Sequence, residues 1–487
     1  MSAHMSPEEF RRHGRQVVDW IADYLAEVES HPVRSRAEPG EVRRALPDAA
    51  PEHGEPFEAV LADVERIILP GLTHWQHPSF FGYFPANTSG PAILGDLLSA
   101  GLGVQGMMWV TSPACTELET VVVDWLAGLL GLPGRFRTDG PGGGVIQDSA
   151  SSASLIALLA ALHRASGGRV AAEGLRGRHT LYVSSQTHSA LEKAARIAGL
   201  GSANVRVVDV DPGTLAMDPA ALRALLARDR AEGAVPAMVC ATVGTTATTA
   251  VDPVAAIGEV CREHGVWLHV DAAYAGVAAI CPELRGLNDG VAEYADSYAT
   301  NPHKWLLTTF DCGLLWVGDR APLLGALSVL PEFLRNAASA GGSVVDYRDW
   351  QVPLGRRFRA LKLWAVLRWY GAEGLRAHIR AGVALAAELA DRVAADPEFV
   401  LFERPRLGLV CFRPAWPGLP AEDADRATLR LMETLNAGGA LFLTHARAGG
   451  RVVLRMAIGG TATERRHVEQ AWDHVRREHS ALKVLMR

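Results

Sequence analysis

Residues 266–318 contain three short β-rich runs in close succession: VWLHVDA (266–272), SYAT (297–300) and CGLLWVG (312–318). Upstream, helical segments alternate with further runs of the same kind, namely TLYVSS (180–185), VRVVDV (205–210) and AMVCATV (237–243). Several of these runs are apolar throughout, as expected of strands that helices cover on both faces. The alternation predicts an α/β domain with a mainly parallel sheet between about Leu94 and Tyr370.

The segments on either side of this domain have different patterns. Apolar residues recur at helical spacing over 8–28 and again over 57–68, which predicts two helices joined by a surface connection. Beyond Gly371 the order becomes helix, strand pair, helix, a second pair of strands (440–446 and 451–458) and a last helix from Thr463. We therefore expect an N-terminal helical segment (1–85), a large α/β domain (86–370) and a small α+β domain (371–487).

Composition narrows the class of protein. The chain has 487 residues, of which 48% are hydrophobic, so it can bury a large core and is too apolar to be disordered. Its net charge of −6 provides no basic field for nucleic acid or an anionic membrane. We find no signal-peptide or membrane-spanning pattern and therefore expect a cytoplasmic protein. Six widely spaced cysteines without a CxxC pair predict reduced thiols and no metal site.

Two candidate sites follow apolar runs, and each has a structural alternative. In GVIQDSASSASL (144–155) a Ser-rich turn precedes a helix, and Ser149, Ala150 and Ser151 are candidates for holding a phosphate. A simple helix cap is the competing interpretation. Asp271 ends the run 266–271, where a carboxylate either faces a ligand at the edge of the sheet or caps the next helix.

Lysine is scarce, because only four of the 48 Lys and Arg residues are lysines. Lys304 follows the run SYAT and lies between His303 and Trp305, where desolvation can make it an amine nucleophile towards an aldehyde cofactor. An ordinary solvated lysine is the alternative. We expect solvated side chains for the other three lysines, which are Lys193, Lys362 and Lys483.

An amine, a carboxylate and an anion site are together what pyridoxal 5′-phosphate (PLP) requires. They occur here in the order phosphate turn, Asp271, Lys304. His188 follows another predicted strand, where an imidazole either stacks on a cofactor ring and moves protons or is simply structural. Over nearly its whole length the chain resembles the group II PLP decarboxylases, most closely the aromatic-L-amino-acid decarboxylases. The matching stretches are FFGYFPANTSGPAILGDLL (80–98), SPACTELETVVVDWL (112–126), GVIQDSASSASL (144–155), WLHVDAAYAG (267–276), NPHKWLLTTFDCGLLWV (301–317) and DYRDWQVPLGRRFRALKLW (346–364).

The resemblance implies PLP fold type I, the aspartate aminotransferase-like fold, for the large domain, and a homodimer on whose partner the N-terminal helices pack. It implies that Lys304 forms the Schiff base with PLP, that Asp271 pairs with the pyridinium nitrogen and that His188 stacks on the ring. The remaining implied roles are phosphate binding by Ala150, Ser151 and Asn301, a place beside the cofactor for Thr242, and support of substrate and proton transfer by His303.

The resemblance also implies a substrate pocket that an aromatic loop and the partner subunit line together. Gln105 and Met107 are the positions expected from the partner, and Gly355 leaves room for a large side chain. Ala86 stands where animal relatives carry a hydroxyl that can meet a catechol ring, so we favour tryptophan, phenylalanine or tyrosine as the substrate. The aromatic-loop residues expected in this pocket are Trp75, Tyr83, Phe84 and Pro85.

The chain departs from the family pattern at three further positions. In the phosphate turn Asp148 replaces a small residue and Ser152 an acidic one, and we expect the Asp148 carboxylate to face away from the phosphate. In the segment 328–350, which resembles the family's mobile catalytic loop, Phe333 stands where decarboxylases usually have a proton-donating tyrosine.

These departures leave two enzyme hypotheses open. Decarboxylation to the amine is our first interpretation. Decarboxylation coupled to oxidative deamination by dioxygen, as in aromatic aldehyde synthases, is the second, and Phe333 favours it. A non-catalytic scaffold is a remote third, because the lysine, aspartate, histidine and phosphate turn are all retained.

Overall fold

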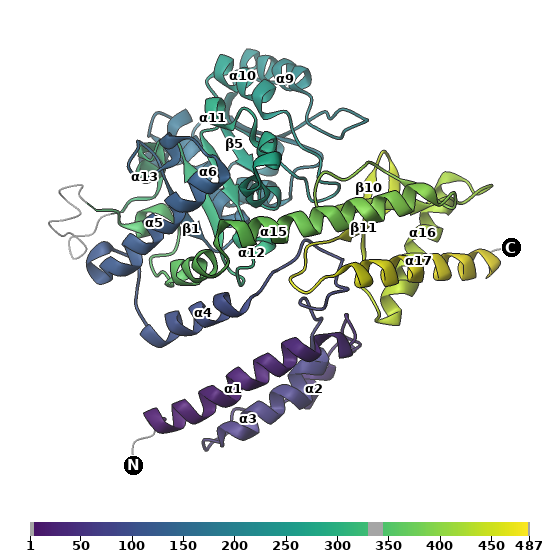
Figure 1. Ribbon diagram of the computed structural model, residues 1–487. Helices are drawn as coiled ribbons and strands as arrows, with labels where there is room; N and C mark the ends of the chain where they lie inside the picture. Colours follow the sequence, from purple (N-terminus) through teal and green to yellow (C-terminus); the bar gives the residue numbers. More distant parts are fainter. Residues whose placement is uncertain (1–3, 330–343, 486–487) are drawn as a thin grey trace.

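The computed structural model describes residues 4–329 and 344–485, and its largest feature is a seven-stranded sheet in the order β1-β7-β6-β5-β4-β2-β3 (Figure 1). Neighbouring strands from β3 to β6 pair in parallel, whereas β7 runs antiparallel to both β1 and β6. The predicted mainly parallel sheet is confirmed, with one reversed strand. The strands are β1 (Gly143–Gln147), β2 (His179–Ser184), β3 (Val205–Val208), β4 (Val235–Thr242), β5 (Trp267–Asp271), β6 (Ser297–Thr300) and β7 (Gly313–Val317).

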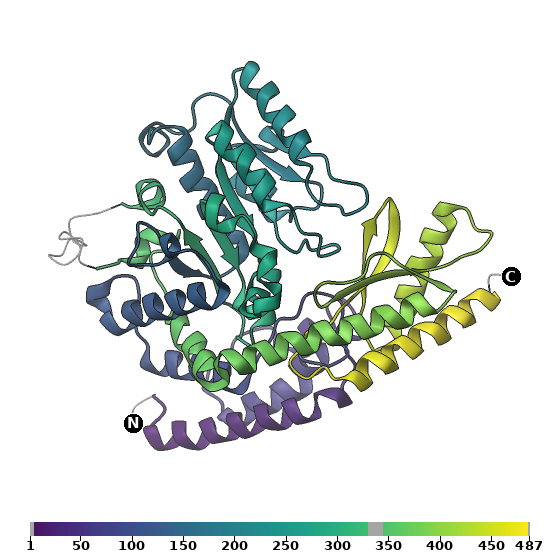
Figure 2. The same cartoon turned by 45° about the horizontal axis from the view of Figure 1, so that its top comes forward.

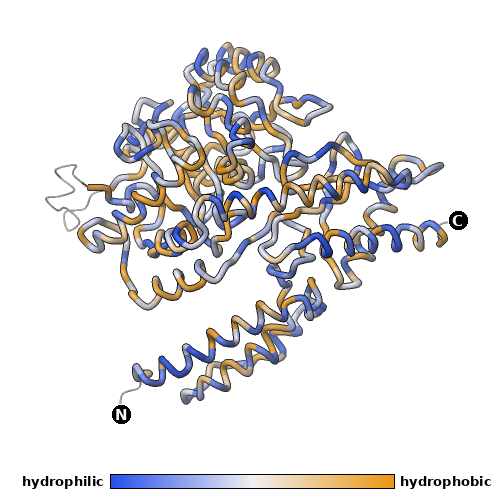
Figure 3. The backbone as a smooth tube through the Cα atoms, viewed as in Figure 1, coloured by the Kyte–Doolittle hydropathy of each residue, from blue (hydrophilic) through white to orange (hydrophobic). Residues whose placement is uncertain are grey.

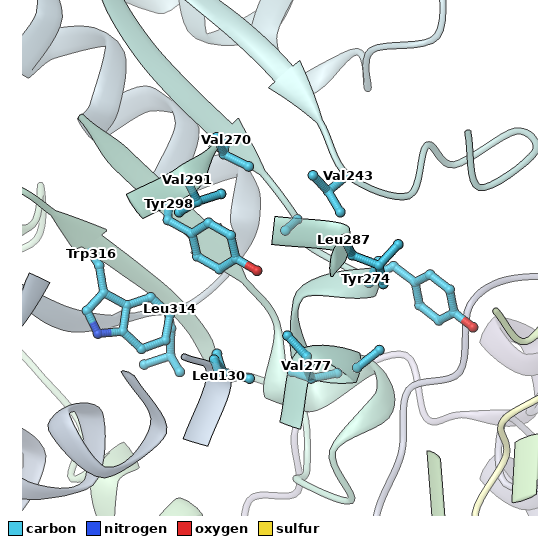
Figure 4. Close-up of a cluster of buried hydrophobic side chains, with 14 of the residues drawn as sticks. Leu130, Val243, Val270, Tyr274, Val277, Leu287, Val291, Tyr298, Leu314 and Trp316 are labelled. Atoms are coloured by element: carbon cyan, nitrogen blue, oxygen red, sulfur yellow. The ribbon is translucent and has the colours of Figure 1, made fainter. Parts of the chain in front are cut away.

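Helices cover both faces of this sheet and divide its core in two. In β4, Met238 and Cys240 pack with α6, α8 and α13, whereas Val239 and Ala241 face the layer that contains α5, α10 and α15. Figure 4 shows part of the second cluster, between the sheet and the segment around Val277. The helices of the large domain are α4 (Gly90–Leu102), α5 (Pro113–Leu130), α6 (Ala150–Ala165), α7 (Val170–Glu173), α8 (Ala190–Ile197), α9 (Pro219–Ala231), α10 (Val254–His264), α11 (Val291–Tyr294), α12 (Pro302–Trp305), α13 (Ala321–Leu327) and the first part of α15 (Arg359–Ala395).

The N-terminal helices form an arm beside the rest of the molecule (Figure 1). α1 (Pro7–Glu27) begins with a capping box between Ser6 and Glu9 and lies along α3 (Phe57–Asp63). Figure 3 shows hydrophobic residues recurring along both helices. The two predicted helices are confirmed, although α3 ends at Asp63, before the end of the run 57–68. The predicted connection between them contains a short helix, α2 (Glu41–Ala45), that the sequence did not indicate, and α3 passes into a π-helical turn at Val64–Ile68.

The small domain is a second, antiparallel sheet with helices packed on it (Figures 1 and 2). α15 reaches it from the large domain and is interrupted at Gly371, whose φ of 60° and ψ of 176° are not helical. The predicted α+β unit is confirmed, although its third strand begins at Thr444, later than the run 440–446 indicated. Its elements are β8 (Phe399–Leu401), β9 (Leu409–Pro414), α16 (Ala421–Gly438), β10 (Thr444–Ala448), β11 (Arg451–Ala457) and α17 (Arg465–Leu485). Across the two described ranges, we find no helix with the length and apolar character needed to cross a membrane.

Candidate active site

The predicted site residues meet at one edge of the large sheet. Because β7 is reversed relative to both neighbours, β1 runs in the same direction as β4, β5 and β6, and their carboxyl ends share this edge. Thr242 ends β4, Asp271 ends β5 and Lys304 lies in α12, directly after β6. Ligands of α/β sheets bind at this edge, so the topology explains why residues far apart in the sequence come together.

A cavity of about 210 Å³ lies between these residues and the start of α6. All the residues predicted to bind the cofactor line it, so the structure brings them together as expected. The lining residues are Phe84, Ser149, Ala150, Ser151, His188, Ala190, Thr242, Gly244, Thr246, Asp271, Ala273, Tyr274, Asn301, His303 and Lys304.

The surroundings of Lys304 favour the neutral form of its amine. Burial lowers its pKa, while the nearby Asp271 carboxylate acts in the opposite direction. A lowered pKa increases the fraction of neutral, nucleophilic amine at neutral pH. Its ammonium lies 5.6 Å from the centre of the Phe84 ring. Another lysine prediction was wrong, because Lys362 is 1% exposed rather than solvated and its Nζ donates to Asp96 at 3.2 Å.

His188 and His303 each present a protonated Nε2. The Nδ1 atom of His188 accepts from the N–H of Ala190 at 3.1 Å, and Nδ1 of His303 accepts from the N–H of Cys312 at 2.8 Å. A backbone N–H can only donate, so the neutral form of each imidazole carries its proton on Nε2. Burial, together with the charge of Lys304, lowers the pKa of His303 to about 4, and burial also lowers the pKa of His188. Both rings are therefore neutral at neutral pH.

The Ser-rich turn before α6 both caps the helix and lines the cavity, so the two interpretations of this turn, helix cap and phosphate site, are compatible. Ser149 caps α6, because its hydroxyl accepts from the N–H of Ser152 at 3.3 Å. The next two residues, Ala150 and Ser151, line the cavity at the helix start, where N–H groups have no acceptor within the helix. Asp148 is exposed, accepts from the Ser149 hydroxyl at 3.0 Å and is not among the lining residues, in keeping with its expected outward orientation.

A glycine lets the phosphate turn come close to Asn301. A Cβ at Gly313, the first residue of β7, would lie 2.9 Å from Asn301 Oδ1 and 3.2 Å from the Cα of Ser149. Asn301 Oδ1 and Thr242 Oγ1 are both buried and have no hydrogen-bond partner among the described residues. Asp271 is 5% exposed, and its Oδ1 accepts from the N–H of Ala273 at 3.0 Å, so it caps the next turn as well as lining the cavity.

A second cavity, of about 500 Å³, opens onto the first, and we call it the substrate chamber. The two cavities share Phe84, His188, Thr246, His303 and Lys304. Aromatic rings back the shared wall, because the Phe84 ring stacks on Tyr274 with centroids 3.6 Å apart and Tyr274 stacks on Trp305 at 4.9 Å. The other lining residues of the chamber are Trp75, Tyr83, Pro85, Ala86, Phe310 and Arg455.

Some predicted residues do not join the site within this chain. Gln105, Met107 and Gly355 line neither cavity, and Gln105 instead accepts from the N–H of Arg356, with its Oε1 2.6 Å from that nitrogen. Phe333 lies outside the described residues.

Sequence reasoning missed Thr246, Phe310 and Arg455. Arg455 had a signal, because it is a charge within the apolar strand run RVVLRMAI (451–458). Phe310 lies within the motif that carries Lys304, and its ring is 4.8 Å from that of His303.

The family model for the pyridoxal-dependent decarboxylase conserved domain matches residues 39–415. The chain belongs to this family. Phenylacetaldehyde synthase from Arabidopsis thaliana is 50% identical to it over 485 residues, which cover 98% of this chain and 97% of the relative. Tryptophan decarboxylase 2 from Oryza sativa subsp. japonica is 46% identical, with 99% and 96% covered. The crystal structure of Oryza sativa TDC with PLP and tryptamine superposes with a TM-score of 0.96 at 42% identity and covers 99% of this chain and 100% of that chain.

This decarboxylase is a carboxy-lyase with PLP as its cofactor, and the smaller cavity fits that group. Asn301 and Thr242 have buried polar atoms that find no partner among the residues the structure describes, which is in keeping with a polar ligand. The helix start at Ala150 suits an anion, and the amine of Lys304 and the carboxylate of Asp271 supply the two groups that the aldehyde and the ring nitrogen of PLP require.

Proposed function

We propose that the protein decarboxylates an aromatic L-amino acid to the corresponding amine and carbon dioxide. The observation that carries this proposal is the substrate chamber, which is lined by Trp75, Tyr83, Phe84 and Phe310 and opens onto Lys304. An aromatic side chain can pack on these rings with its amino-acid end at the cofactor cavity. Tryptophan and tyrosine decarboxylases among the relatives support the same substrate class.

Different residues around the smaller cavity would bind different parts of PLP. Bound PLP supplies an electron sink for the pair released when the bond between Cα and the carboxylate breaks. Lys304 would link to it, Asp271 would keep its ring nitrogen protonated, and Ala150 and Ser151 with Asn301 would hold its phosphate. The neutral imidazoles of His188 and His303 hold protons on Nε2 beside the same space.

The chamber also orients the substrate and excludes water. Its aromatic wall is rigid, because Phe84 is stacked on Tyr274 and Trp305 behind it. A rigid wall that holds the side-chain ring would also restrict the direction of the bond to the carboxylate relative to Lys304. Apolar lining removes water that would otherwise compete for the reacting groups.

The decisive test incubates the purified holoenzyme with L-tryptophan, L-phenylalanine or L-tyrosine singly and measures carbon dioxide, amine, aldehyde and peroxide together. We expect carbon dioxide and amine in equal amounts. Lys304→Ala is the matched negative variant and should lose both the absorbance of the linked cofactor and carbon dioxide release. A wild type that releases no carbon dioxide from any of the three contradicts the proposal.

A second candidate function rests on Phe333, which has no hydroxyl with which to return a proton. In that case dioxygen takes two electrons from the substrate carbon, and amino acid, dioxygen and water give aldehyde, carbon dioxide, ammonia and hydrogen peroxide. Phenylacetaldehyde synthase among the relatives supports this reaction class. Peroxide equal to carbon dioxide in the same assay would establish it, and Phe333→Tyr should then raise the amine fraction.

We further propose that the enzyme is a homodimer in which the partner subunit completes the substrate chamber. Four leucines of α4, namely Leu94, Leu97, Leu98 and Leu102, are each about half exposed, with values from 49% to 60%. Apolar surface of this extent on one helix is typical of an interface.

Gln105 and Met107 follow that helix and line neither cavity of their own chain, in keeping with a place in the partner's chamber. Light scattering should give the mass of a dimer. Mixed dimers of Lys304→Ala and Gln105→Trp chains should recover about half of the wild-type activity, because one of the two sites then carries neither change. A monomeric mass, or no recovery on mixing, contradicts this arrangement.

A further inference from the structure

Arg455 in β11 is a buried cation in the wall of the substrate chamber. Arg455 is only 4% exposed, and this burial lowers the pKa of its guanidinium. The guanidinium carbon is 5.6 Å from the centre of the Phe84 ring. A buried charge is costly unless its donors are satisfied, so the acceptors around it show what the residue does.

The guanidinium of Arg455 joins three segments that are far apart in the sequence. Nη1 donates to the carbonyl of Gly82 at 3.1 Å and to Oγ1 of Thr444 at 2.7 Å. Nη2 donates to the carbonyl of Thr246 at 2.7 Å, and Nε donates to the carbonyl of Ala247 at 3.0 Å. All four acceptors are uncharged oxygens, so these bonds fix backbone positions rather than neutralise the charge.

Two of the joined segments form walls of the site. Thr246 lines both cavities, and Gly82 immediately precedes Tyr83 and Phe84 of the chamber. The small domain also packs closely on Gly82, since a Cβ there would lie 2.4 Å from the ring of Phe442. The aromatic wall is therefore held against the loop at Thr246 by a residue of the small domain.

We propose that Arg455 is the positioning residue for the substrate's aromatic side chain. By fixing Gly82 against Thr246 and Ala247, it sets the distance between the aromatic wall and Lys304. Arginine presents five N–H donors on three nitrogens of a planar fork, which reach the four separated acceptors here, whereas the three donors of a lysine ammonium all start from one atom. This inference rests on the proposed function, because it assigns a binding step to that reaction.

The test compares wild type with Arg455→Gln, Arg455→Lys and Thr444→Val. Thr444→Val removes one of the four hydrogen-bond acceptors of Arg455 without changing the arginine itself. Arg451→Lys is the control, because Arg451 lies on the same strand and pairs with Asp425 outside the site. Holoenzymes are measured for cofactor absorbance, for KM and kcat with L-tryptophan and L-phenylalanine, and for the Kd of L-tryptophan methyl ester by the change in cofactor absorbance. The ester has no free carboxylate to lose, so its Kd does not depend on decarboxylation.

We expect Arg455→Gln to raise KM and the ester Kd roughly tenfold and to change kcat by less than about threefold. Arg455→Lys should fall close to the glutamine variant, Thr444→Val should shift both constants by a smaller factor, and the control should match wild type. A purely structural role would reduce the amount of active enzyme and leave KM and Kd unchanged, which overturns the inference, as does full rescue by lysine. If wild type releases no carbon dioxide while the ester Kd still rises in Arg455→Gln, the proposed function fails and the positioning role stands.

Discussion

Acid should destabilise this protein through histidines that are buried as neutral groups, and His269 in β5 is the clearest case. It is 0% exposed, its Nδ1 lies 2.8 Å from Oγ of Ser297, and its Nε2 has no partner among the described residues. Burial lowers the pKa of His269 to about 4, and His303, 4% exposed, has a pKa lowered to about 4 for the same main reason. In the unfolded chain a histidine has a pKa of about 6.5.

The size of the effect follows from these two pKa values. Between pH 6.5 and about 4 the unfolded chain binds a proton at each site that the folded chain does not, so stability falls as the pH falls. Each histidine removes about 1.4 kcal/mol of unfolding free energy per pH unit, and two remove about 3 kcal/mol. Domains are typically stable by only about 5–15 kcal/mol, so a fall of one pH unit within this range consumes a large share. Well above pH 6.5 this contribution is fully present.

Urea unfolding of the holoenzyme at a series of pH values between about 7.5 and 5 measures this slope. His269→Gln removes one titrating group and should lower the slope by about 1.4 kcal/mol per pH unit in the acid part of this range, where the unfolded histidine is fully protonated. His53→Gln, at an exposed position of the N-terminal connection, is the matched control and should leave the slope unchanged. Equal slopes for wild type and His269→Gln would refute the reasoning.

Three further predictions follow from single contacts. Gly313→Ala places a methyl group 2.9 Å from Asn301 Oδ1 and should weaken PLP binding about tenfold in an absorbance titration, whereas an unchanged Kd speaks against the close approach. Glu119→Ala leaves the buried Arg356 without its two bonds of 2.8 and 2.9 Å and should cost about 3–5 kcal/mol in urea unfolding; a loss below about 1 kcal/mol contradicts it. Asp271→Asn should lower kcat by about a hundredfold or more while cofactor absorbance is retained, and a near-normal kcat would exclude its role at the ring nitrogen.

The cofactor residues could be predicted because their positions follow from topology. Thr242 and Asp271 end strands that the apolar runs identified, and Lys304 follows the next strand. In an α/β sheet the carboxyl ends of such strands share an edge, so linear order along the chain was enough to place them together.

Residues whose roles depend on packing between segments could not be predicted in this way. Lys362 lies in a sequence stretch that also carries Arg357 and Arg359. The close approach of α4 at Gly95 nevertheless buries it, since a Cβ on that glycine would lie 2.5 Å from the Cα of Lys362. Arg455 is one of 44 arginines, and its acceptors come from segments up to 373 residues away. The charge of Arg455 within an apolar strand run marks the residue, but no periodic or local pattern indicates which acceptors it meets.

The balance between amine and aldehyde is decided where the two cavities meet. An amine requires that a proton return to the substrate carbon that loses carbon dioxide, and an aldehyde requires that dioxygen react there first. His188 and His303 both line the shared wall and both carry an N–H at Nε2, so the described residues offer hydrogen-bond donors beside the shared space. A phenylalanine at position 333 adds no hydroxyl, and the two proposed reactions compete for the same substrate carbon. The rate at which a proton reaches that carbon, relative to the arrival of dioxygen, therefore sets the product ratio.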